Sequence, residues 1–145
     1  MRILITTDVE GGVWSYTEEL VGGLTARGHE VVLVVLGREP EAAGRSWLAT
    51  AGVEIVALPC RLEWEPGAEA ELGASVERLR QVVERVAPDV VHLNQFYYGA
   101  FDLGAPRLVV AHSDVVSWWR AVRGEDPPDD AWMRRYRGWV QDGLR

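Results

Sequence analysis

The chain has 145 residues, of which 48% are apolar, and this length and composition predict a single domain with its own hydrophobic core. The formal net charge of −7 gives no broad basic surface, so we expect no nucleic-acid partner. All 15 basic residues are arginines, which excludes both a Schiff-base lysine and the lysine of a P-loop.

A single cysteine, Cys60, cannot form an internal disulfide and favours a reducing setting. The apolar segments are each shorter than about ten residues, so they predict neither a membrane-spanning helix nor a signal sequence. We therefore expect a cytoplasmic protein with no stable membrane span.

Five short apolar runs predict β-strands along the chain. Within them polar and apolar residues do not alternate, which is typical of parallel strands covered by helices on both faces. The runs lie at residues 2–7, 31–36, 53–58, 90–93 and 108–111.

The segments between the strands predict the covering helices. Apolar residues at intervals of three and four predict helices over 14–27 and 72–86. The pair Asp129 and Asp130 predicts the cap of a last helix that runs through Trp139. Strands that alternate with helices predict an α/β fold with a doubly wound, Rossmann-like, mainly parallel sheet of about five strands flanked by helices. Ligands of such folds bind at the carboxyl ends of the strands.

The first candidate site is the glycine loop after the first predicted strand. Gly11 and Gly12 would let the backbone approach a ligand, and the next helix offers free N–H groups and the positive end of its dipole to a phosphate. Asp8 and Glu10 would repel a phosphate unless they point away or a cation intervenes. An ordinary tight turn explains the same glycines, because neither the dinucleotide fingerprint nor the P-loop is present.

The second candidate is His112, which directly follows the fifth predicted strand. An imidazole at this end of the sheet can donate a hydrogen bond to a ligand oxygen, although it can also cap the next helix or satisfy a loop carbonyl. His92 lies inside the fourth predicted strand, so we expect it to be buried and hydrogen-bonded. His29 lies at a helix-to-strand turn at the opposite edge of the sheet and is expected to be structural.

Polar and aromatic residues after the fourth and fifth strands form the third candidate site. Aromatic faces beside amide groups suit a sugar or another hydroxyl-rich molecule. The residues are Asn94, Gln95, Tyr97 and Trp118. The alternative is that the late aromatic residues pack the last helices against the sheet, and these residues are Trp118, Trp132, Tyr136 and Trp139.

Four parts of the chain together resemble the N-terminal, acceptor-side domain of the family 4 retaining glycosyltransferases, which have the GT-B architecture. The first part is MRILITTD with EGGVWSY after it, the second is LTARGHEV, the third is APDVVHL and the fourth is LVVAHS. Their order and spacing cover nearly the whole chain, so the resemblance assigns residues 1–145 to one Rossmann-like domain of such an enzyme.

The resemblance implies a two-domain enzyme whose cleft holds a nucleotide-sugar donor against a hydroxyl acceptor. The backbone of Gly11 and Gly12 would approach the donor diphosphate, and His112 would lie beside the transferring sugar. The residues that would shape the acceptor pocket are Tyr16, Asn94, Gln95 and Tyr97. Transfer would retain the anomeric configuration, with no metal ion and with no cofactor beyond the nucleotide sugar as co-substrate.

In such enzymes a second domain supplies the nucleotide pocket, and this C-terminal donor domain is absent from the chain. We therefore expect the chain to be inactive alone, as a part of a longer enzyme or beside a partner chain that contributes the missing half. The alternative is a non-catalytic α/β binding module for a nucleotide, a glycan or a protein partner. A sheet that lacks an edge strand also predicts a homodimer along that edge or over the tryptophan-rich last helix.

Overall fold

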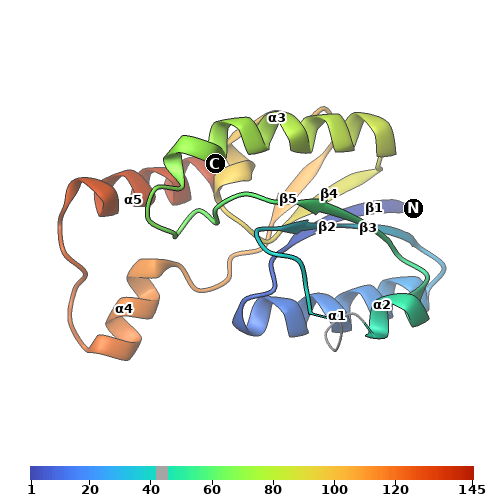
Figure 1. The fold of residues 1–145 in the computed structure, drawn as a ribbon, viewed down its shortest axis with the longest axis horizontal. Coiled ribbons are helices and arrows are strands. Elements are labelled where there is room, and N and C mark those ends of the chain that lie inside the picture. The colour runs from blue at the N-terminus through green and yellow to red at the C-terminus, as the bar shows by residue number, and fades with distance from the viewer. Residues whose placement is uncertain (42–45) are drawn as a thin grey trace.

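The computed structural model describes residues 1–41 and 46–145 and shows one five-stranded sheet between helices (Figure 1). The strands are β1 (Arg2–Thr7), β2 (Glu30–Leu36), β3 (Glu54–Leu58), β4 (Val90–Leu93) and β5 (Arg107–Val109). They lie in the order β3-β2-β1-β4-β5, and every neighbouring pair is parallel. The predicted Rossmann-like α/β fold is therefore confirmed.

Helices cover both faces of the sheet. The helices α1 (Gly11–Thr25) and α2 (Ser46–Ala51) lie on one face, and α3 (Glu69–Val86) lies on the other (Figure 1). Alternate residues of β1 enter different cores: Leu4 packs in the core that α3 covers, whereas Ile5 packs in the core that α1 covers. A strand buried on both faces needs apolar side chains on both, which explains its continuous apolar run.

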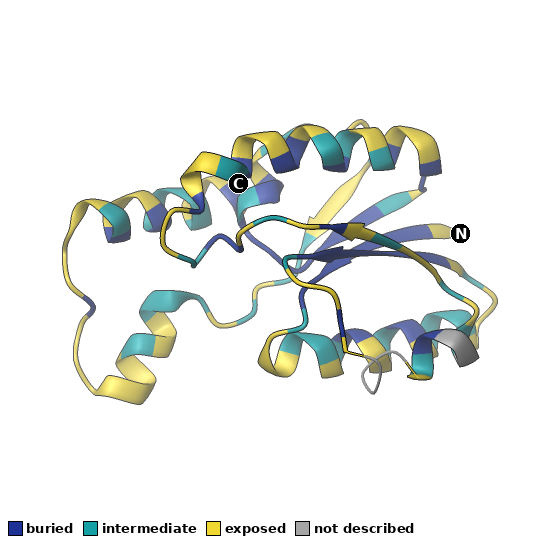
Figure 2. Ribbon diagram, viewed as in Figure 1, coloured by how far each residue is buried: buried dark blue, intermediate teal, exposed yellow. Residues whose placement is uncertain are grey.

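The last third of the chain adds three helices around the carboxyl ends of the strands. They are the 3-10 helix η2 (Tyr97–Ala100), α4 (Val115–Arg123) and α5 (Ala131–Gly143). The N-cap of α5 is Asp130, as predicted, and its side chain accepts a hydrogen bond from the Met133 N–H. The helix α5 packs on η2, whereas α4 reaches away from the sheet and has no buried residue (Figure 2).

Several helices differ from the prediction. The helix α3 begins at Glu69, three residues before its predicted start, and α5 continues beyond Trp139 to Gly143. The helix α1 begins three residues before the predicted start, at Gly11, because Glu10 is extended and serves as its N-cap. The helix α2 was not predicted, since six residues are too few to show a helical period.

The edge strands differ from the expectation that helices cover every strand on both faces. Ile55 of β3 is 41% exposed and Leu108 of β5 is 43% exposed, whereas the inner strands are buried (Figure 2). An edge strand has a neighbour on one side only, so fewer helices lie over it. A dimer along such an edge stays a prediction.

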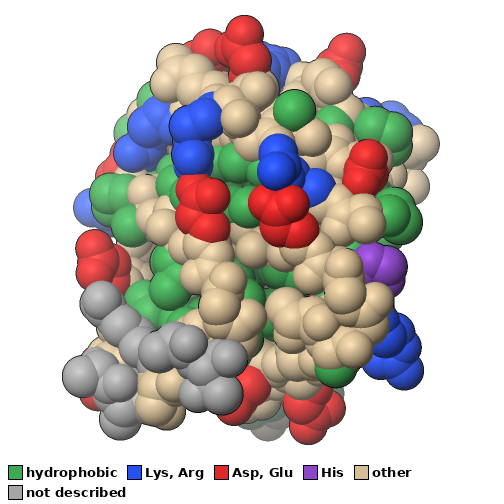
Figure 3. All heavy atoms as spheres, turned by 90° about the vertical axis from the view of Figure 1, so that its right-hand side faces the viewer, with side chains coloured by type: hydrophobic (Ala, Val, Ile, Leu, Met, Phe, Trp, Pro, Cys, Tyr) green, Lys and Arg blue, Asp and Glu red, His purple; other side chains and the backbone are tan. Residues whose placement is uncertain are grey.

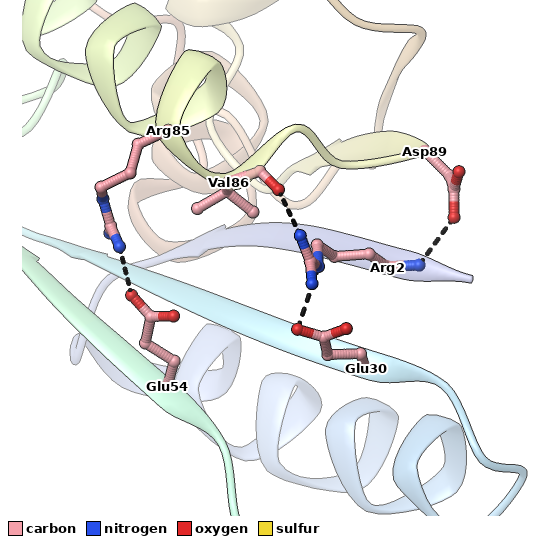
Figure 4. A network of polar contacts seen from close by, with 6 residues as sticks. All are labelled: Arg2, Glu30, Glu54, Arg85, Val86 and Asp89. Carbon is pink, nitrogen blue, oxygen red and sulfur yellow. Dashed lines mark hydrogen bonds and ion pairs between the residues drawn. The ribbon is translucent and has the colours of Figure 1, made fainter.

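Charged groups at the amino ends of the strands pair with one another. Figure 4 shows this network, which contains Arg2, Glu30, Glu54, Arg85, Val86 and Asp89. The guanidinium of Arg2 lies 2.9 Å from the Glu30 carboxylate and donates to the Val86 carbonyl oxygen, also at 2.9 Å. Figure 3 views this end of the molecule and shows arginine side chains beside acidic ones. These ions already have partners, whereas the polar groups at the opposite end of the sheet lie where ligands bind in such folds.

The helix α5 approaches η2 most closely at two glycines. A Cβ atom added at Gly99 would collide with the Gly143 carbonyl oxygen, and one added at Gly143 would collide with the Phe96 carbonyl oxygen. We expect Gly143→Ala to lower the free energy of unfolding by about 1–3 kcal/mol, because these backbone atoms cannot move aside easily. The control is Gly138→Ala on the same helix, where the added Cβ meets no atom within 4 Å. Equal stability of the two variants in urea denaturation would contradict this close packing.

Candidate functional site

Polar side chains gather where the carboxyl ends of β1 and β4 lie side by side. The sheet order makes this the switch point, because the chain leaves β1 toward β2 on one side and reaches β4 on the other. Ligands of open α/β sheets bind at this position. The buried polar residues there are Thr6, Thr7, Asp8, Thr17, His92, Asn94 and Gln95.

Asp8 lies beneath the glycine loop and is 1% exposed. Its Oδ1 accepts a hydrogen bond from the Glu10 N–H at 2.8 Å, and its Oδ2 accepts one from Gln95 Nε2 at 2.9 Å. Burial raises the pKa of Asp8, and these two hydrogen bonds act in the opposite direction. The carboxylate is therefore occupied inside the protein and does not face a ligand above the loop.

Glu10 is paired with a cation that the sequence analysis did not single out. Arg38 follows β2, and its Nε lies 2.7 Å from Glu10 Oε1, with both side chains about half exposed. The position of Arg38 was the available signal, because it lies two residues after the end of β2, the strand that neighbours β1. Asp8 is thus bonded inside the protein and Glu10 has a cationic partner, so neither carboxylate stands unpaired at this loop.

The glycine loop leaves room above the start of α1. Gly11 has a φ of +55°, which favours glycine, and a Cβ atom added at Gly11 or Gly12 would meet nothing within 4 Å. Glu10 makes no side-chain cap hydrogen bond to the helix, and no other side chain in the part of the chain that the structure describes caps it. The first N–H groups of α1 thus lack a capping side chain at an open surface, which is the arrangement that binds anions.

His112 contacts the amide of Asn94 and the ring of Tyr16, and Tyr16 belongs to the helix that begins at Gly11. Its Nε2 is 3.0 Å from Asn94 Oδ1, and its ring centroid is 5.0 Å from that of Tyr16 in an edge-to-face arrangement. Burial lowers the pKa of His112, while the nearby charge of Asp8 raises it. The structure therefore brings together three of the predicted site residues, Tyr16, Asn94 and His112.

The two amides after β4 lie in the floor of this site. Asn94 is 4% exposed and Gln95 is 1% exposed. Gln95 accepts a hydrogen bond from the Thr6 hydroxyl at 2.8 Å and donates to Asp8, so both ends of its amide are used. These two side chains can support a binding surface from below. His92 is buried and hydrogen-bonded to Asn94, as predicted.

The aromatic candidates lie further away and differ from one another. The ring of Tyr97 packs against Tyr98, Phe101 and Trp139, and so joins η2 to α5. Trp118 is exposed on α4, and its only ring contact among the described residues is with Trp119.

Tyr136 supports the alternative in which the late aromatic residues fix the last helices. It is buried, its ring stacks on Trp132, and its hydroxyl accepts a hydrogen bond from the Val115 N–H at 3.1 Å. Val115 is the first residue of α4, three positions after His112. Tyr136 therefore ties the segment that carries His112 to α5.

A buried carboxylate, Glu63, was missed by the sequence analysis. It lies in the loop after β3 and accepts hydrogen bonds from the N–H groups of Phe96 and Tyr97, at 3.1 and 2.7 Å. Burial raises the pKa of Glu63 to about 7, although both hydrogen bonds act in the opposite direction. The sequence offered one signal of this burial, because Glu63 stands between the apolar residues Leu62 and Trp64.

Two hollows on the surface are lined by residues other than those of the glycine loop. A hollow of about 520 Å³ lies between α3 and the segment before β5, and one of about 200 Å³ lies between α4 and α5. Among the described residues, no group of three or more His, Cys, Asp or Glu side chains could hold a metal ion. None of the described helices is long and apolar enough to cross a membrane.

Comparisons with known proteins identify relatives by sequence pattern and by fold. A family model described as Glycosyltransferase Family 4 matches residues 10–144. A search of curated proteins found no match.

Three solved structures of glycosyltransferases share the fold at low sequence identity. The chain is similar to the glycotransferase of kitacinnamycin with 19% identity and a TM-score of 0.53, over 98% of this chain and 40% of that one. A UGT transferase from Siraitia grosvenorii in complex with UDP has 14% identity and a TM-score of 0.55, over 86% of this chain and 32% of that one. A calicheamicin glycosyltransferase has 19% identity and a TM-score of 0.53, over 99% of this chain and 43% of that one. The chain thus spans less than half the length of each.

Proposed function

Since the chain belongs to the family described as Glycosyltransferase Family 4, we propose that it is the acceptor-side domain of a retaining glycosyltransferase of GT-B fold. The full enzyme would transfer a sugar from a nucleotide-sugar donor to a hydroxyl acceptor with retention at the anomeric carbon. The observation that carries the proposal is the meeting of Tyr16, Asn94 and His112 beside an open glycine loop at the switch point.

The donor diphosphate would bind at the start of α1. The N–H groups of Gly11 and Gly12 would donate to phosphate oxygens, and the positive end of the helix dipole would favour the negative charge. Arg38 neutralises Glu10 at the same loop, which removes a charge that would repel the diphosphate. In the transition state, charge grows on the departing diphosphate, so groups that stabilise this charge lower the barrier.

The sugar that is transferred would lie beside His112. The imidazole would contact a hydroxyl group of the sugar, and Tyr16 next to it would form part of the wall toward the acceptor. Asn94 and Gln95 would act from the floor, while Tyr97 and Trp118 would take part only at a more distant portion of the acceptor. The resemblance implies that the second domain supplies the nucleotide pocket, which agrees with the 32–43% of the related chains that this chain covers.

Release of nucleotide from a nucleotide sugar tests the proposal directly. The enzyme with both domains is mixed with a panel of nucleotide sugars and of hydroxyl acceptors, and free nucleotide is measured. We expect release that depends on both the sugar and the acceptor, with the anomeric configuration of the product unchanged by NMR. No release with any donor contradicts the transferase, and an inverted product contradicts retention.

Gly12→Ala separates binding from folding at the glycine loop. The added Cβ meets no atom of the protein, so we expect no loss of stability, and a gain of up to about 1 kcal/mol from helix propensity. A bound diphosphate would meet this Cβ, so we expect kcat/KM for the donor to fall about tenfold or more. The control is Gly22→Ala later in α1, where the added Cβ also meets nothing. Unchanged donor kinetics in the Gly12 variant would place the diphosphate elsewhere.

The second candidate function is a binding module without catalysis. The open N-terminus of α1 favours it, since this anion site lies within the chain itself. Titration of the chain with nucleoside diphosphates distinguishes the two functions. Saturable binding by the chain alone supports the module, whereas the acceptor-side domain binds such ligands weakly without its donor domain.

A further inference from the structure

The amide of Asn94 has one orientation only. Its Nδ2 donates a hydrogen bond to the backbone carbonyl oxygen of Thr6 at 2.9 Å and lies 3.4 Å from the Thr17 hydroxyl. A carbonyl oxygen can accept a hydrogen bond but cannot donate one, so the NH₂ end of the amide must face Thr6. The side chain is 4% exposed, which leaves no water-filled space for the reverse orientation.

This orientation determines the protons on two histidines. Asn94 Oδ1 lies 3.0 Å from His112 Nε2 and 3.2 Å from His92 Nε2. An amide oxygen only accepts, so both Nε2 atoms carry a hydrogen. Burial lowers the pKa of each imidazole, which favours the neutral form. A neutral imidazole has a single N–H, so Nδ1 of His112 carries a lone pair.

The Nδ1 atom of His112 is available to a ligand. It has no hydrogen-bond partner among the residues that the structure describes. The two nitrogens of an imidazole point in widely different directions, and Nε2 points toward the buried Asn94. Nδ1 therefore points away from that amide. The groups that face the ring are Tyr16 from α1, His92 and Asn94 from the end of β4, and the charge of Asp8 after β1.

We propose that Asn94 is a positioning residue, which holds His112 in the tautomer with its hydrogen on Nε2, so that Nδ1 accepts a hydrogen bond from a carbohydrate hydroxyl. The identity of the ligand rests on the proposed function, whereas the tautomer does not. A lone pair on Nδ1 suits the O–H of a sugar and disfavours a deprotonated phosphate oxygen, which has no hydrogen to donate. His112 thus recognises a sugar hydroxyl, and the diphosphate is left to the glycine loop.

The tautomer is tested by NMR on the chain of residues 1–145, without substrate. Long-range ¹H–¹⁵N correlations distinguish a protonated from an unprotonated ring nitrogen, and His29→Gln and His92→Gln assign the three histidines. Above the pH at which His112 becomes neutral, we expect a protonated Nε2 and an unprotonated Nδ1. The opposite tautomer in the wild-type chain overturns the proposal, and the two histidine variants serve only to assign the signals.

The role of Asn94 is tested with two variants. Asn94→Ala removes the acceptor, so we expect His112 to become a mixture of tautomers. Asn94→Asp keeps an acceptor oxygen toward His112 and adds a negative charge, so we expect the Nε2–H tautomer and a higher pKa of His112. Its second oxygen faces the Thr6 carbonyl oxygen in place of the amide NH₂, so we also expect a lower free energy of unfolding. If the ring keeps one tautomer in the alanine variant, Asn94 does not position it.

Kinetics of the enzyme with both domains test the hydroxyl contact. We expect Asn94→Ala to lower kcat by up to about 10²-fold, and Asn94→Asp to restore part of it while the acidic limb of the pH profile moves to higher pH. A raised KM for the nucleotide sugar assigns the hydroxyl to the donor, and a raised KM for the acceptor assigns it there. Unchanged kinetics overturn the contact. If no sugar is transferred by the wild type, the proposed function and the carbohydrate ligand fail, but the tautomer stands.

Discussion

Replacing His112 by alanine is expected to lower the kcat of sugar transfer by about 10²-fold or more, because the variant would lose the proposed polar contact to the sugar. The side chain is half-buried and stabilises no other element through a hydrogen bond, apart from its bond to Asn94. We therefore expect the free energy of unfolding to change little, by about 1 kcal/mol. Nucleotide release and urea denaturation measure the two effects.

His29→Ala is the matched control for this substitution. His29 lies before β2, at the amino ends of the strands and so at the opposite end of the sheet from His112. We expect full activity from this variant. If the His112 variant turns over at the rate of the wild type, the proposed contact of His112 with the sugar is wrong.

Replacing Glu63 by alanine is expected to give the largest loss of stability, about 2–5 kcal/mol in the free energy of unfolding. The carboxylate accepts from the N–H groups of Phe96 and Tyr97, and without it both donors stay buried with no partner. These N–H groups belong to the turn that leads from β4 into η2, so the turn would also lose its contact with the loop after β3. Urea denaturation at pH 6 measures the loss.

The same carboxyl group predicts a dependence of stability on pH. Its pKa is about 7 in the folded chain, against the ordinary glutamate value of 4.5, so the folded state holds the proton more tightly than the unfolded state. The stability that Glu63 gains from holding this proton is fully present below pH 4.5 and is lost as the pH rises through about 7. Asp8, whose pKa is also raised, acts in the same direction.

Glu63→Gln isolates the contribution of this group. The variant cannot ionise and keeps one acceptor oxygen, so we expect it to be less stable than the wild type at pH 5 and to approach it at pH 8. Urea midpoints at several pH values measure the difference. Parallel curves for the two proteins would show that Glu63 is ionised in the folded chain throughout this range.

Much of the fold could be predicted from the sequence, because each strand of a parallel sheet carries a strong local signal. The apolar runs located all five strands, and the aspartates before the last helix located its cap at Asp130. The strand order could not be predicted this way. It depends on the side of the sheet to which each helical connection adds the next strand, and no local pattern gives that side. For the same reason the chain alone did not indicate that β1 and β4 are neighbours.

The candidate site was predicted in part for a similar reason. Gly11, Asn94 and His112 could be singled out because each follows a strand. The roles of the polar residues depend on contacts between distant segments, such as Thr6 with Gln95 or Arg38 with Glu10, and no local pattern encodes them. Asn94 and Gln95 were therefore predicted to bind an acceptor, although both side chains are buried and hydrogen-bonded within the protein.

The tether between Tyr136 and Val115 has a consequence for the segment that carries His112. Asn94 holds the imidazole from one side, and the Tyr136 hydroxyl holds the backbone three residues later. A short stretch fastened at both ends has few conformations to lose when a ligand arrives, so little entropy opposes its ordering. The imidazole is thus preorganised in part by α5, a helix that lies after it in the chain.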